Sequence, residues 1–420
     1  MEVGGCDTVE LAKKYGTPLF IMDEATLRNQ CRAYIKAFAN KAKDFEVIYA
    51  SKAFTCIAMC QIVKQEGLSL DIMSAGELFT ALKAGFPMGK TFLHGNNKTP
   101  DELELALDSD VGRIVVDGFD ELELLNEIAG KKGKIQPILI RVTPGIKPQT
   151  HSYIQTGQID SKFGFGLQDG LAIKAVKRAL ELESVELKGI HAHIGSQIFA
   201  LHSYAKAIEI VMGFVREIKD ETGLAISELN TGGGLGAKYK ATDAPSTIEE
   251  YAEVIMDGVL REAERLNLSV PKVMVEPGRS IVANAGITVY TVGAIKEIPN
   301  IRTYVSVDGG MSDNLRPMLY GAVYEALLAN RAAEEPEMLV TIAGKHCESG
   351  DILIKNIELP YPKVGDILCT PATGAYGYVM ANNYNRQPKP AVILVNNGRD
   401  RAIIRRETLE DLVRLDESLD

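Results

Sequence analysis

Lys52 follows a short apolar run, residues 45–50, that is crowded with β-branched and aromatic side chains. This composition predicts a strand that stops just before the lysine. A lysine held between apolar neighbours at a strand end can have its pKa lowered, and its neutral amine can then form a Schiff base with an aldehyde. Lys52 is therefore a candidate nucleophile, although most lysines are simply solvated at the surface.

Further polar residues follow other short β-branched runs. They are Asp71, His94, Asn96, Asp117, Arg141, His191, His193, Glu276 and Arg279. A glycine-rich turn, residues 232–236, follows one more run and could offer backbone N–H groups to a phosphate, although glycines also make ordinary tight turns. A lysine for an aldehyde and a turn for a phosphate together suggest pyridoxal 5′-phosphate as a cofactor.

Glu276 and His193 each have a functional and a structural interpretation. A carboxylate at Glu276 could keep a pyridine nitrogen protonated and so make the ring a sink for electrons, or it could form a strand-end salt bridge. His193 could stack on the cofactor ring or be a hydrogen-bonded core histidine. A metal pair of His191 and His193 is disfavoured because no third ligand is evident, so no metal is expected.

These residues need a scaffold that brings many strand ends together. Eight short β-branched runs alternate with helical stretches, at residues 45–50, 68–72, 91–93, 113–117, 137–142, 185–191, 226–230 and 272–276. The first five start 22 to 24 residues apart, the span of a strand and a returning helix. This period predicts a (β/α)8 TIM barrel, with an open doubly wound sheet as the alternative. The longer gap after the fifth run contains residues 150–153 and 161–164, which we interpret as an inserted active-site loop.

Barrel enzymes place their chemistry at the carboxyl ends of the strands, which is where the polar residues fall. After about Ser280 the sequence changes to many short β-rich runs without helical crossovers. We therefore predict an α/β fold plus a β domain. Residues 25–280 form the cofactor-binding barrel, residues 281–420 form a mostly antiparallel β domain, and residues 1–24 add to that domain.

The composition narrows the possible partners. A net charge of −10 without Lys/Arg blocks argues against nucleic acid or an anionic membrane as a partner, so a small-molecule substrate is expected. No apolar run approaches the roughly 18 residues that span a bilayer, and the first residues lack a targeting pattern, so a cytoplasmic location is expected. The six cysteines form neither a disulfide framework nor paired zinc motifs.

The chain resembles the fold-type III pyridoxal-phosphate-dependent decarboxylases nearly from end to end. The motifs that carry the resemblance are Tyr49-Ala50-Ser51-Lys52-Ala53, Ser161-Lys162-Phe163-Gly164, His193-Ile194-Gly195-Ser196-Gln197, Gly232-Gly233-Gly234-Leu235-Gly236, Glu276-Pro277-Gly278-Arg279, Asp308-Gly309-Gly310-Met311, Arg316-Pro317-x-Leu319-Tyr320, Cys347-Glu348-Ser349-Gly350-Asp351 and Gly374-Ala375-Tyr376. The stretch 382–386 also looks familial, without an evident role.

The resemblance implies roles for particular residues. Lys52 is the Schiff-base lysine, His193 stacks on the cofactor and Glu276 holds the pyridine nitrogen. The implied cofactor-binding set is Lys52, Asp71, His193, Ser196, Gly233, Gly234, Gly236, Glu276 and Tyr376. The implied substrate-binding set is Arg279, Arg316, Tyr320, Glu348 and Tyr376. Planar arginine forks suit a carboxylate and a glutamate suits an ammonium, which matches a substrate with an amino acid group at each end.

The implied reaction is the decarboxylation of meso-2,6-diaminopimelate to L-lysine. Cys347 is implied to lie near the reacting carbon as a proton donor, although a buried inert thiol is the usual fate of a cysteine. In the family this segment reaches the barrel of the partner subunit, so the resemblance also implies a homodimer with shared active sites.

Three alternatives stay open. A related ornithine- or arginine-type decarboxylase is one, although such enzymes tend to carry Cys-Asp where this chain has Cys347-Glu348. An amino-acid racemase on the same barrel is disfavoured because racemases resemble a design with arginine at the position of Glu276. A non-enzymatic pyridoxal-phosphate-binding protein would not explain the residues after Ser280.

Overall fold

The computed structural model describes residues 1–146 and 160–419, so the expected loop segment 150–153 lies outside the described residues. The chain forms two compact units. The barrel unit comprises Gln30–Gly236 and Ala244–Ser280, and the β unit comprises Met1–Asn29, Ala237–Asp243 and the residues from Ile281 onward. The short segment Ala237–Asp243 thus leaves the barrel unit between two of its elements and groups with the β unit.

Eight parallel strands close into a barrel. They are β4 (Phe45–Ala50), β5 (Ser69–Ile72), β6 (Thr91–Leu93), β7 (Arg113–Val116), β8 (Gln136–Thr143), β10 (Val185–Ala192), β11 (Glu228–Asn230) and β12 (Lys272–Val275). Pairing of β12 with β4 and of β8 with β10 closes the ring, and a short strand, β9 (Phe165–Gly166), adds to β8. The predicted (β/α)8 barrel is confirmed, and the open sheet is excluded.

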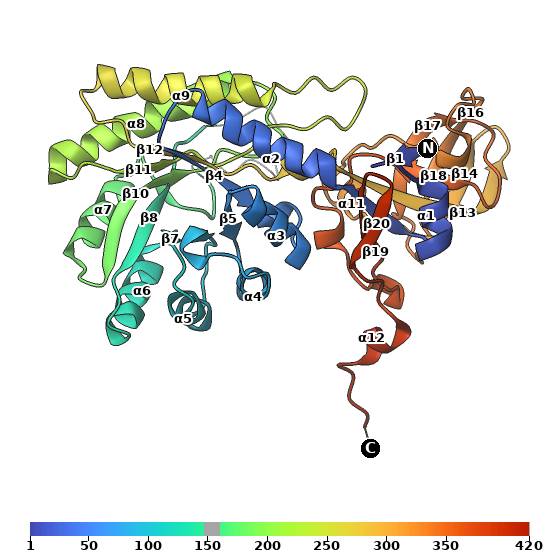
Figure 1. Ribbon diagram of the computed structural model, residues 1–420, viewed down its shortest axis with the longest axis horizontal. Coiled ribbons are helices and arrows are strands. Elements are labelled where there is room, and N and C mark those ends of the chain that lie inside the picture. The colour runs from blue at the N-terminus through green and yellow to red at the C-terminus, as the bar shows by residue number, and fades with distance from the viewer. Residues whose placement is uncertain (147–159, 420) are drawn as a thin grey trace. The chain divides into compact units, whose positions relative to one another are not determined.

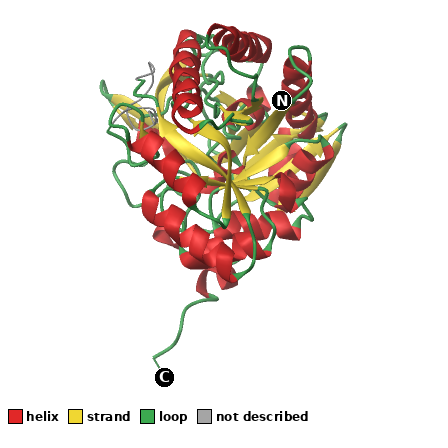
Figure 2. Ribbon diagram, turned by 90° about the vertical axis from the view of Figure 1, so that its left-hand side faces the viewer, coloured by secondary structure: helices red, strands yellow, loops and turns green. Residues whose placement is uncertain are grey.

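Helices surround the strands of the barrel (Figures 1 and 2). They are α2 (Glu24–Ala39), α3 (Ile57–Gln65), α4 (Ala75–Lys83), α5 (Pro100–Asp108), α6 (Phe119–Lys131), α7 (Leu171–Glu181), α8 (His202–Thr222) and α9 (Ile248–Arg265). Local sequence sets where some of them begin. Thr99 and Thr247 each form a capping box with a glutamate three residues on, and so satisfy backbone N–H groups at the starts of α5 and α9.

The barrel interior is filled by apolar side chains from several strands. Ile48, Phe92, Val115, Leu139 and Met274 form one buried cluster. Side chains alternate between the two faces of a strand, so every second residue of these runs can point inward. The interior is therefore a packed core, and the space for chemistry lies at the strand ends.

The β unit is built on a mixed sheet in the order β17-β16-β14-β13-β3-β19-β20. Its strands are β3 (Leu19–Asp23), β13 (Gly286–Ile298), β14 (Arg302–Val307), β16 (Met338–Ala343), β17 (Ile352–Leu359), β19 (Ala391–Asn396) and β20 (Arg399–Ile404), with β15 (Leu327–Leu328) and β18 (Ile367–Thr370) paired beside them. The pairs β14–β16 and β3–β19 are parallel, and the other pairs of this sheet are antiparallel. A β domain that is mostly antiparallel is thereby confirmed.

The remaining elements of the β unit are short. They are β1 (Glu2–Val3), β2 (Cys6–Asp7), α1 (Thr8–Tyr15), α11 (Arg316–Tyr320) and α12 (Leu409–Val413), and along the chain the boundary between the two units falls within α10 (Arg279–Val282). The N-terminal strand β3 lies in the middle of the sheet, where its Leu19 and Ile21 pack with Val289, Ile393 and Val395. Among the described helices, none combines the length and the apolar character needed to span a bilayer.

Candidate active site

The candidate residues of the barrel unit lie at the carboxyl ends of the barrel strands. Lys52 lies in a single 3-10 turn, Ser51–Ala53, directly after β4. The strand register sets Asp71 opposite Ala50, and His191 opposite both Arg141 and Asn230. Because the strands are parallel, these positions lie on one rim of the barrel.

The carboxylate of Glu276 is the centre of a buried cluster on this rim. Asn230 donates from Nδ2 to Oε1 over 2.7 Å, and His94 Nε2 lies 2.9 Å from the same oxygen. His191 Nε2 lies 3.1 Å from Oε2, and the two histidine rings meet edge to face with centroids 4.9 Å apart. Sequence reasoning predicted Glu276 but missed Asn230, although it is the last residue of a predicted run.

The electrostatics of this cluster favour an ionised Glu276. Burial alone would raise the pKa of Glu276, but the neighbouring His94 and His191 outweigh it and hold the pKa well below its usual value. Burial lowers the pKa of His191 to about 4, against the opposing pull of Glu276. A neutral His191 can therefore donate its Nε2 proton to the carboxylate.

His94, His191 and Glu276 also form a group that could bind a metal ion, since their ligand atoms lie within 4.8 Å of one another. The expected absence of a third ligand beside His191 and His193 is corrected in part, because His94 and Glu276 join His191 while His193 stays outside the group. The separations of 2.9 and 3.1 Å between the histidine nitrogens and the carboxylate oxygens lie in the range of hydrogen bonds. Asn230 and His191 are hydrogen-bonded to this carboxylate, whereas His94 Nε2 is close to Oε1 without hydrogen-bond geometry.

Asp71 is a buried carboxylate on the rim that lacks hydrogen-bond donors within the described residues. It is fully buried, and neither carboxylate oxygen has a hydrogen-bond partner within the described residues. Burial raises the pKa of Asp71, while the charges of His94 and Lys52 oppose the rise. A buried carboxylate without donors is costly, so this position calls for a cationic or hydrogen-bond-donating group.

A second buried network lies between β6, β7 and α6. Lys98 bonds the Gly95 and Val115 carbonyls and pairs with Glu121 at 2.7 Å. The other oxygen of Glu121 accepts the backbone N–H of Asp117 at 3.3 Å. Sequence reasoning missed Lys98 and Glu121, because a lysine and a glutamate in polar stretches normally indicate a solvated surface. Asn96, two residues before Lys98, was singled out instead, and it is exposed.

Asp117 and Arg141 support the loop after β8. Both side chains are buried. Asp117 accepts the backbone N–H of Gly164, and the Arg141 guanidinium lies 4.3 Å from the centre of the Phe163 ring. The described part of the expected loop, residues 161–164, is thus held against the rim.

The glycine-rich turn after β11 is explained first by close packing. A Cβ on Gly233 would lie 2.0 Å from the Glu276 carbonyl oxygen, and one on Gly234 would lie 2.3 Å from the Gly195 carbonyl oxygen. Gly232 donates to Asn230 Oδ1 at 2.9 Å. Gly236 donates to a backbone carbonyl at 3.0 Å. The close approaches at Gly233 and Gly234 require glycine whether or not the turn binds phosphate.

His193 and Ser196 lie next to this turn. Gly233 donates its N–H to His193 Nδ1 at 3.2 Å, so a neutral His193 carries its proton on Nε2. Burial, together with the charges of Lys52 and Arg141, lowers the pKa of His193 well below its usual value. Arg279 donates from Nε and Nη2 to Ser196 Oγ, both at 3.1 Å.

The remaining candidate residues belong to the β unit. Arg316 is buried on α11 and donates from Nη1 to the hydroxyls of Tyr239 at 3.1 Å and Tyr324 at 2.5 Å. Tyr320 lies at the end of the same helix and is half-buried. Three further candidates lie on loops: Cys347 and Glu348 are exposed between β16 and β17, and Tyr376 is half-buried with a φ of 58° after β18.

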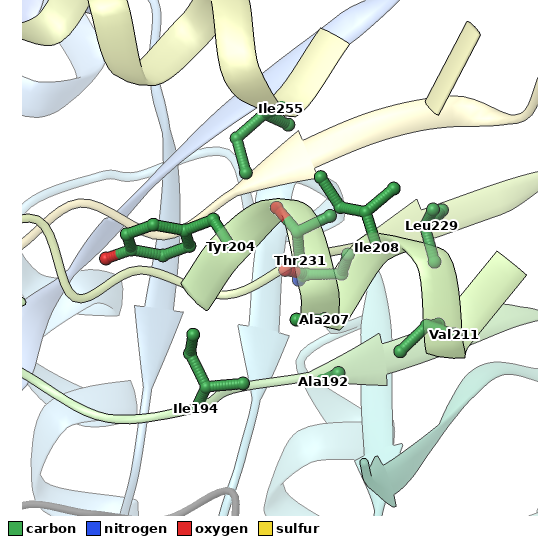
Figure 3. Close-up of a pocket in the computed structure, with 10 residues that line it drawn as sticks. Ala192, Ile194, Tyr204, Ala207, Ile208, Val211, Leu229, Thr231 and Ile255 are labelled. Atoms are coloured by element: carbon green, nitrogen blue, oxygen red, sulfur yellow. The ribbon is translucent and has the colours of Figure 1, made fainter. Parts of the chain in front are cut away.

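One small cavity lies in the barrel wall, between β10, β11, α8 and α9 (Figure 3). Its volume is about 10 Å³, and apolar residues such as Ile194, Ile208 and Val211 line most of it. A space of that size admits no more than a water molecule. The cavity is therefore too small for a cofactor or a substrate.

Comparison with known proteins shows to which family the chain belongs. The family described as pyridoxal-dependent decarboxylase, pyridoxal binding domain, matches residues 24–283. This match covers more than half of the chain, which therefore belongs to the pyridoxal-dependent decarboxylases. The predicted family and its cofactor, pyridoxal 5′-phosphate, are confirmed.

Relatives within this class are diaminopimelate decarboxylases. The chain is 48% identical to the one from Bacillus subtilis and 50% identical to the one from Halalkalibacterium halodurans, in each case over 99% of this chain and 95% of the relative. The crystal structure of diaminopimelate decarboxylase from M. jannaschii in complex with L-lysine is 36% identical. The two structures superpose with a TM-score of 0.92, over 98% of this chain and 94% of the M. jannaschii chain.

Proposed function

We propose that the chain releases carbon dioxide from meso-2,6-diaminopimelate and forms L-lysine. The observation that carries the proposal is the barrel rim, where Lys52, the buried Asp71 and the hydrogen-bonded Glu276 lie at the ends of neighbouring strands. The full-length likeness to diaminopimelate decarboxylases supports this substrate over ornithine or arginine.

The rim fits pyridoxal 5′-phosphate. Lys52 would bind its aldehyde carbon, Asp71 would receive a donor that the described residues do not supply, and His193 would pack against the ring. Ser196, Gly233, Gly234, Gly236 and Tyr376 complete the proposed cofactor-binding set. When bound, the cofactor draws electrons away from the α-carbon of the substrate as the carboxylate leaves.

Glu276 would hold the pyridine nitrogen. A carboxylate can accept about four hydrogen bonds. Asn230 and His94 lie against Oε1, and His191 lies against Oε2. One acceptor position on Oε2 is left for a ring N–H. Because these neighbours keep Glu276 ionised, the carboxylate favours the protonated pyridine, which is the stronger electron acceptor.

The far end of the substrate would meet charges of both signs. Arg279, Arg316 and Tyr320 would bind its distal carboxylate, and Glu348 would bind its distal ammonium. Two tyrosine hydroxyls already orient Arg316, which lowers the cost of presenting its guanidinium. Arg316→Lys keeps the charge but loses the planar fork, so the KM for diaminopimelate should rise while ornithine remains a non-substrate.

We further propose a homodimer in which Cys347 and Glu348 complete the site of the other subunit. The exposure of both side chains at the tip of a loop supports this arrangement, since it leaves them accessible to a second chain. In this site Cys347 would hold a proton for delivery to the carbon that loses carbon dioxide.

The substrate assignment is tested by measuring carbon dioxide release from meso-diaminopimelate, L-ornithine and L-arginine with the enzyme saturated with pyridoxal 5′-phosphate. Release from diaminopimelate alone is expected, and release from ornithine or arginine alone would replace the assignment with the related decarboxylase. Borohydride reduction followed by peptide mapping tests the lysine separately. The label should lie on Lys52, and a label on any other residue would refute its role.

A further inference from the structure

The turn Asn382–Arg386 contacts the loop that carries Cys347 and Glu348. This loop, residues 344–351, joins β16 to β17 and is closed at its base by the hydrogen bond from Gly344 N to the Asp351 carbonyl at 2.9 Å. Its tip is exposed, so packing does little to hold it. Its geometry must therefore come from specific hydrogen bonds.

Asp351 organises the base of the loop from within. Its side chain is 2% exposed, and Oδ1 accepts the N–H of Met311 at 2.7 Å. Oδ2 accepts the N–H of His346 at 3.0 Å and lies 2.7 Å from Nδ1 of the same histidine. The two ends of the loop are thereby joined through one buried carboxylate.

The turn 382–386 holds the other side of this base. The Tyr384 ring stacks on the His346 ring with an angle of 15° and centroids 5.9 Å apart. Asn385 Oδ1 accepts the backbone N–H of Cys347 at 2.8 Å. The turn itself is tied to the body of the β unit by the bond from Asn382 N to the Ser312 carbonyl at 2.8 Å.

The conformation of Asn385 serves this contact. Its φ is 52°, a left-handed conformation that asparagine tolerates better than most residues other than glycine. Its neighbour Asn383 has an ordinary negative φ and bonds the Gln387 carbonyl and Glu407 instead. The two asparagines therefore have different tasks, and the contact of Asn385 is with the backbone of Cys347.

We propose that Asn385 is a positioning residue for Cys347, and that the turn Asn382–Arg386 sets the geometry of the Cys347–Glu348 tip. The inference rests on the proposed function only in taking this tip as part of the active site. It gives the stretch 382–386, which had no evident role in the sequence, a physical task.

Hydrogen exchange at the Cys347 amide tests the contact without any activity measurement. Asn385→Gly removes the acceptor and accepts the positive φ without strain, whereas Asn385→Asp keeps an oxygen acceptor. In the holoenzyme, Asn385→Gly should speed exchange in the peptide 345–351 by about two- to tenfold, the effect of one lost hydrogen bond. Asn385→Asp and the control Asn383→Ala should leave that rate unchanged, and an unchanged rate in Asn385→Gly would refute the contact.

Hybrid dimers separate positioning from general destabilisation. A Lys52→Ala chain paired with a Cys347→Ala chain should contain one complete site, whose loop comes from the Lys52→Ala chain. Asn385→Gly placed on the Lys52→Ala chain should lower kcat/KM of the hybrid by roughly ten- to hundredfold, because a small displacement of a reacting group is costly. The same substitution on the Cys347→Ala chain should have no effect.

If Asn385→Gly lowered kcat/KM equally on the Lys52→Ala chain and on the Cys347→Ala chain, the positioning role of Asn385 would be refuted. A hybrid that is inactive even without Asn385→Gly would instead contradict the proposed sharing of sites, and the exchange rate would then decide on Asn385.

Discussion

Replacing Asn230 by aspartate tests whether Glu276 is held as a buried anion. The two side chains have the same shape, and the new carboxylate keeps an acceptor for the Gly232 N–H. It also puts a second carboxylate where Asn230 Nδ2 now donates to Glu276 Oε1 over 2.7 Å. Two carboxylates at that distance cannot both be ionised in a buried site, so they share one proton.

The sign of the pH dependence follows from proton counting. In the unfolded chain both carboxyls lose their protons above about pH 4 to 5. The folded Asn230→Asp variant keeps one, so its stability relative to the parent falls as pH rises, by about 1.4 kcal/mol per pH unit up to the raised pKa. Between pH 5 and 7 the loss relative to the parent is about 2.7 kcal/mol, or a drop in melting temperature of about 3 to 5 °C for a chain or unit of this size.

The parent protein behaves differently in this range. Its Glu276 pKa is lowered on folding, so the stabilisation from this group is fully present above the unfolded pKa and is lost only as pH falls through the folded one. Between pH 5 and 7 Glu276 therefore adds no slope.

Thermal midpoints at pH 5, 6 and 7 measure the effect, with Asn230→Leu as the matched control. The leucine variant also loses the hydrogen bond to Glu276 and adds no charge, and in addition it loses the acceptor for the Gly232 N–H. Its deficit should be about 1.5 to 3 kcal/mol, the value of a hydrogen bond to a charged group, and constant with pH. Parallel curves for the aspartate and leucine variants would refute the description of Glu276 as the ionised centre of the cluster.

Two further predictions concern the glycine turn and the shared site. Gly233→Ala should lower the stability of the barrel unit by about 1 to 3 kcal/mol and weaken cofactor binding, because its Cβ would overlap the Glu276 carbonyl oxygen, whereas Gly213→Ala, with open space inside α8, should be neutral or slightly stabilising. Melting temperature and cofactor titration measure both variants, and equal behaviour would contradict the close-packing account. Mixing the inactive chains Lys52→Ala and Cys347→Ala should restore part of the activity, and no recovery after confirmed subunit exchange would exclude shared sites.

The regular alternation of strand-like and helix-like runs in the sequence predicted where each candidate residue of the barrel lies. A run of β-branched residues predicts a strand, and the register of parallel strands brings the residues after each run to one rim. Lys52, Asp71 and Glu276 could be placed in this way from the residue pattern alone, because strand formation depends mainly on local residue types. The cofactor followed from the chemistry of a lysine and a glycine-rich turn suited to phosphate, together with the family resemblance.

Which partners these residues have was decided by the closed barrel. His94 follows one run, and Asn230 and Glu276 end two others. Only the ring of strand pairings brings His94 and Asn230 next to the Glu276 carboxylate. The same holds for Lys98, which is buried by its loop path while nearby Asn96 is exposed. The direction of a side chain in a loop depends on what packs against it, and that is not written in the local sequence.

The sequence by itself thus determined the barrel, the β domain and the rim on which the candidate residues lie. It also pointed to the glycine turn and to the stretch 382–386, but it did not show what they contact. Only the tertiary structure showed that backbone oxygens lie too close to these glycines for a Cβ atom to fit. It also showed that Asn385 accepts a hydrogen bond from the backbone N–H of Cys347. Hydrophobic and polar periodicity specifies elements one at a time, whereas contacts between distant residues arise only when those elements are packed together.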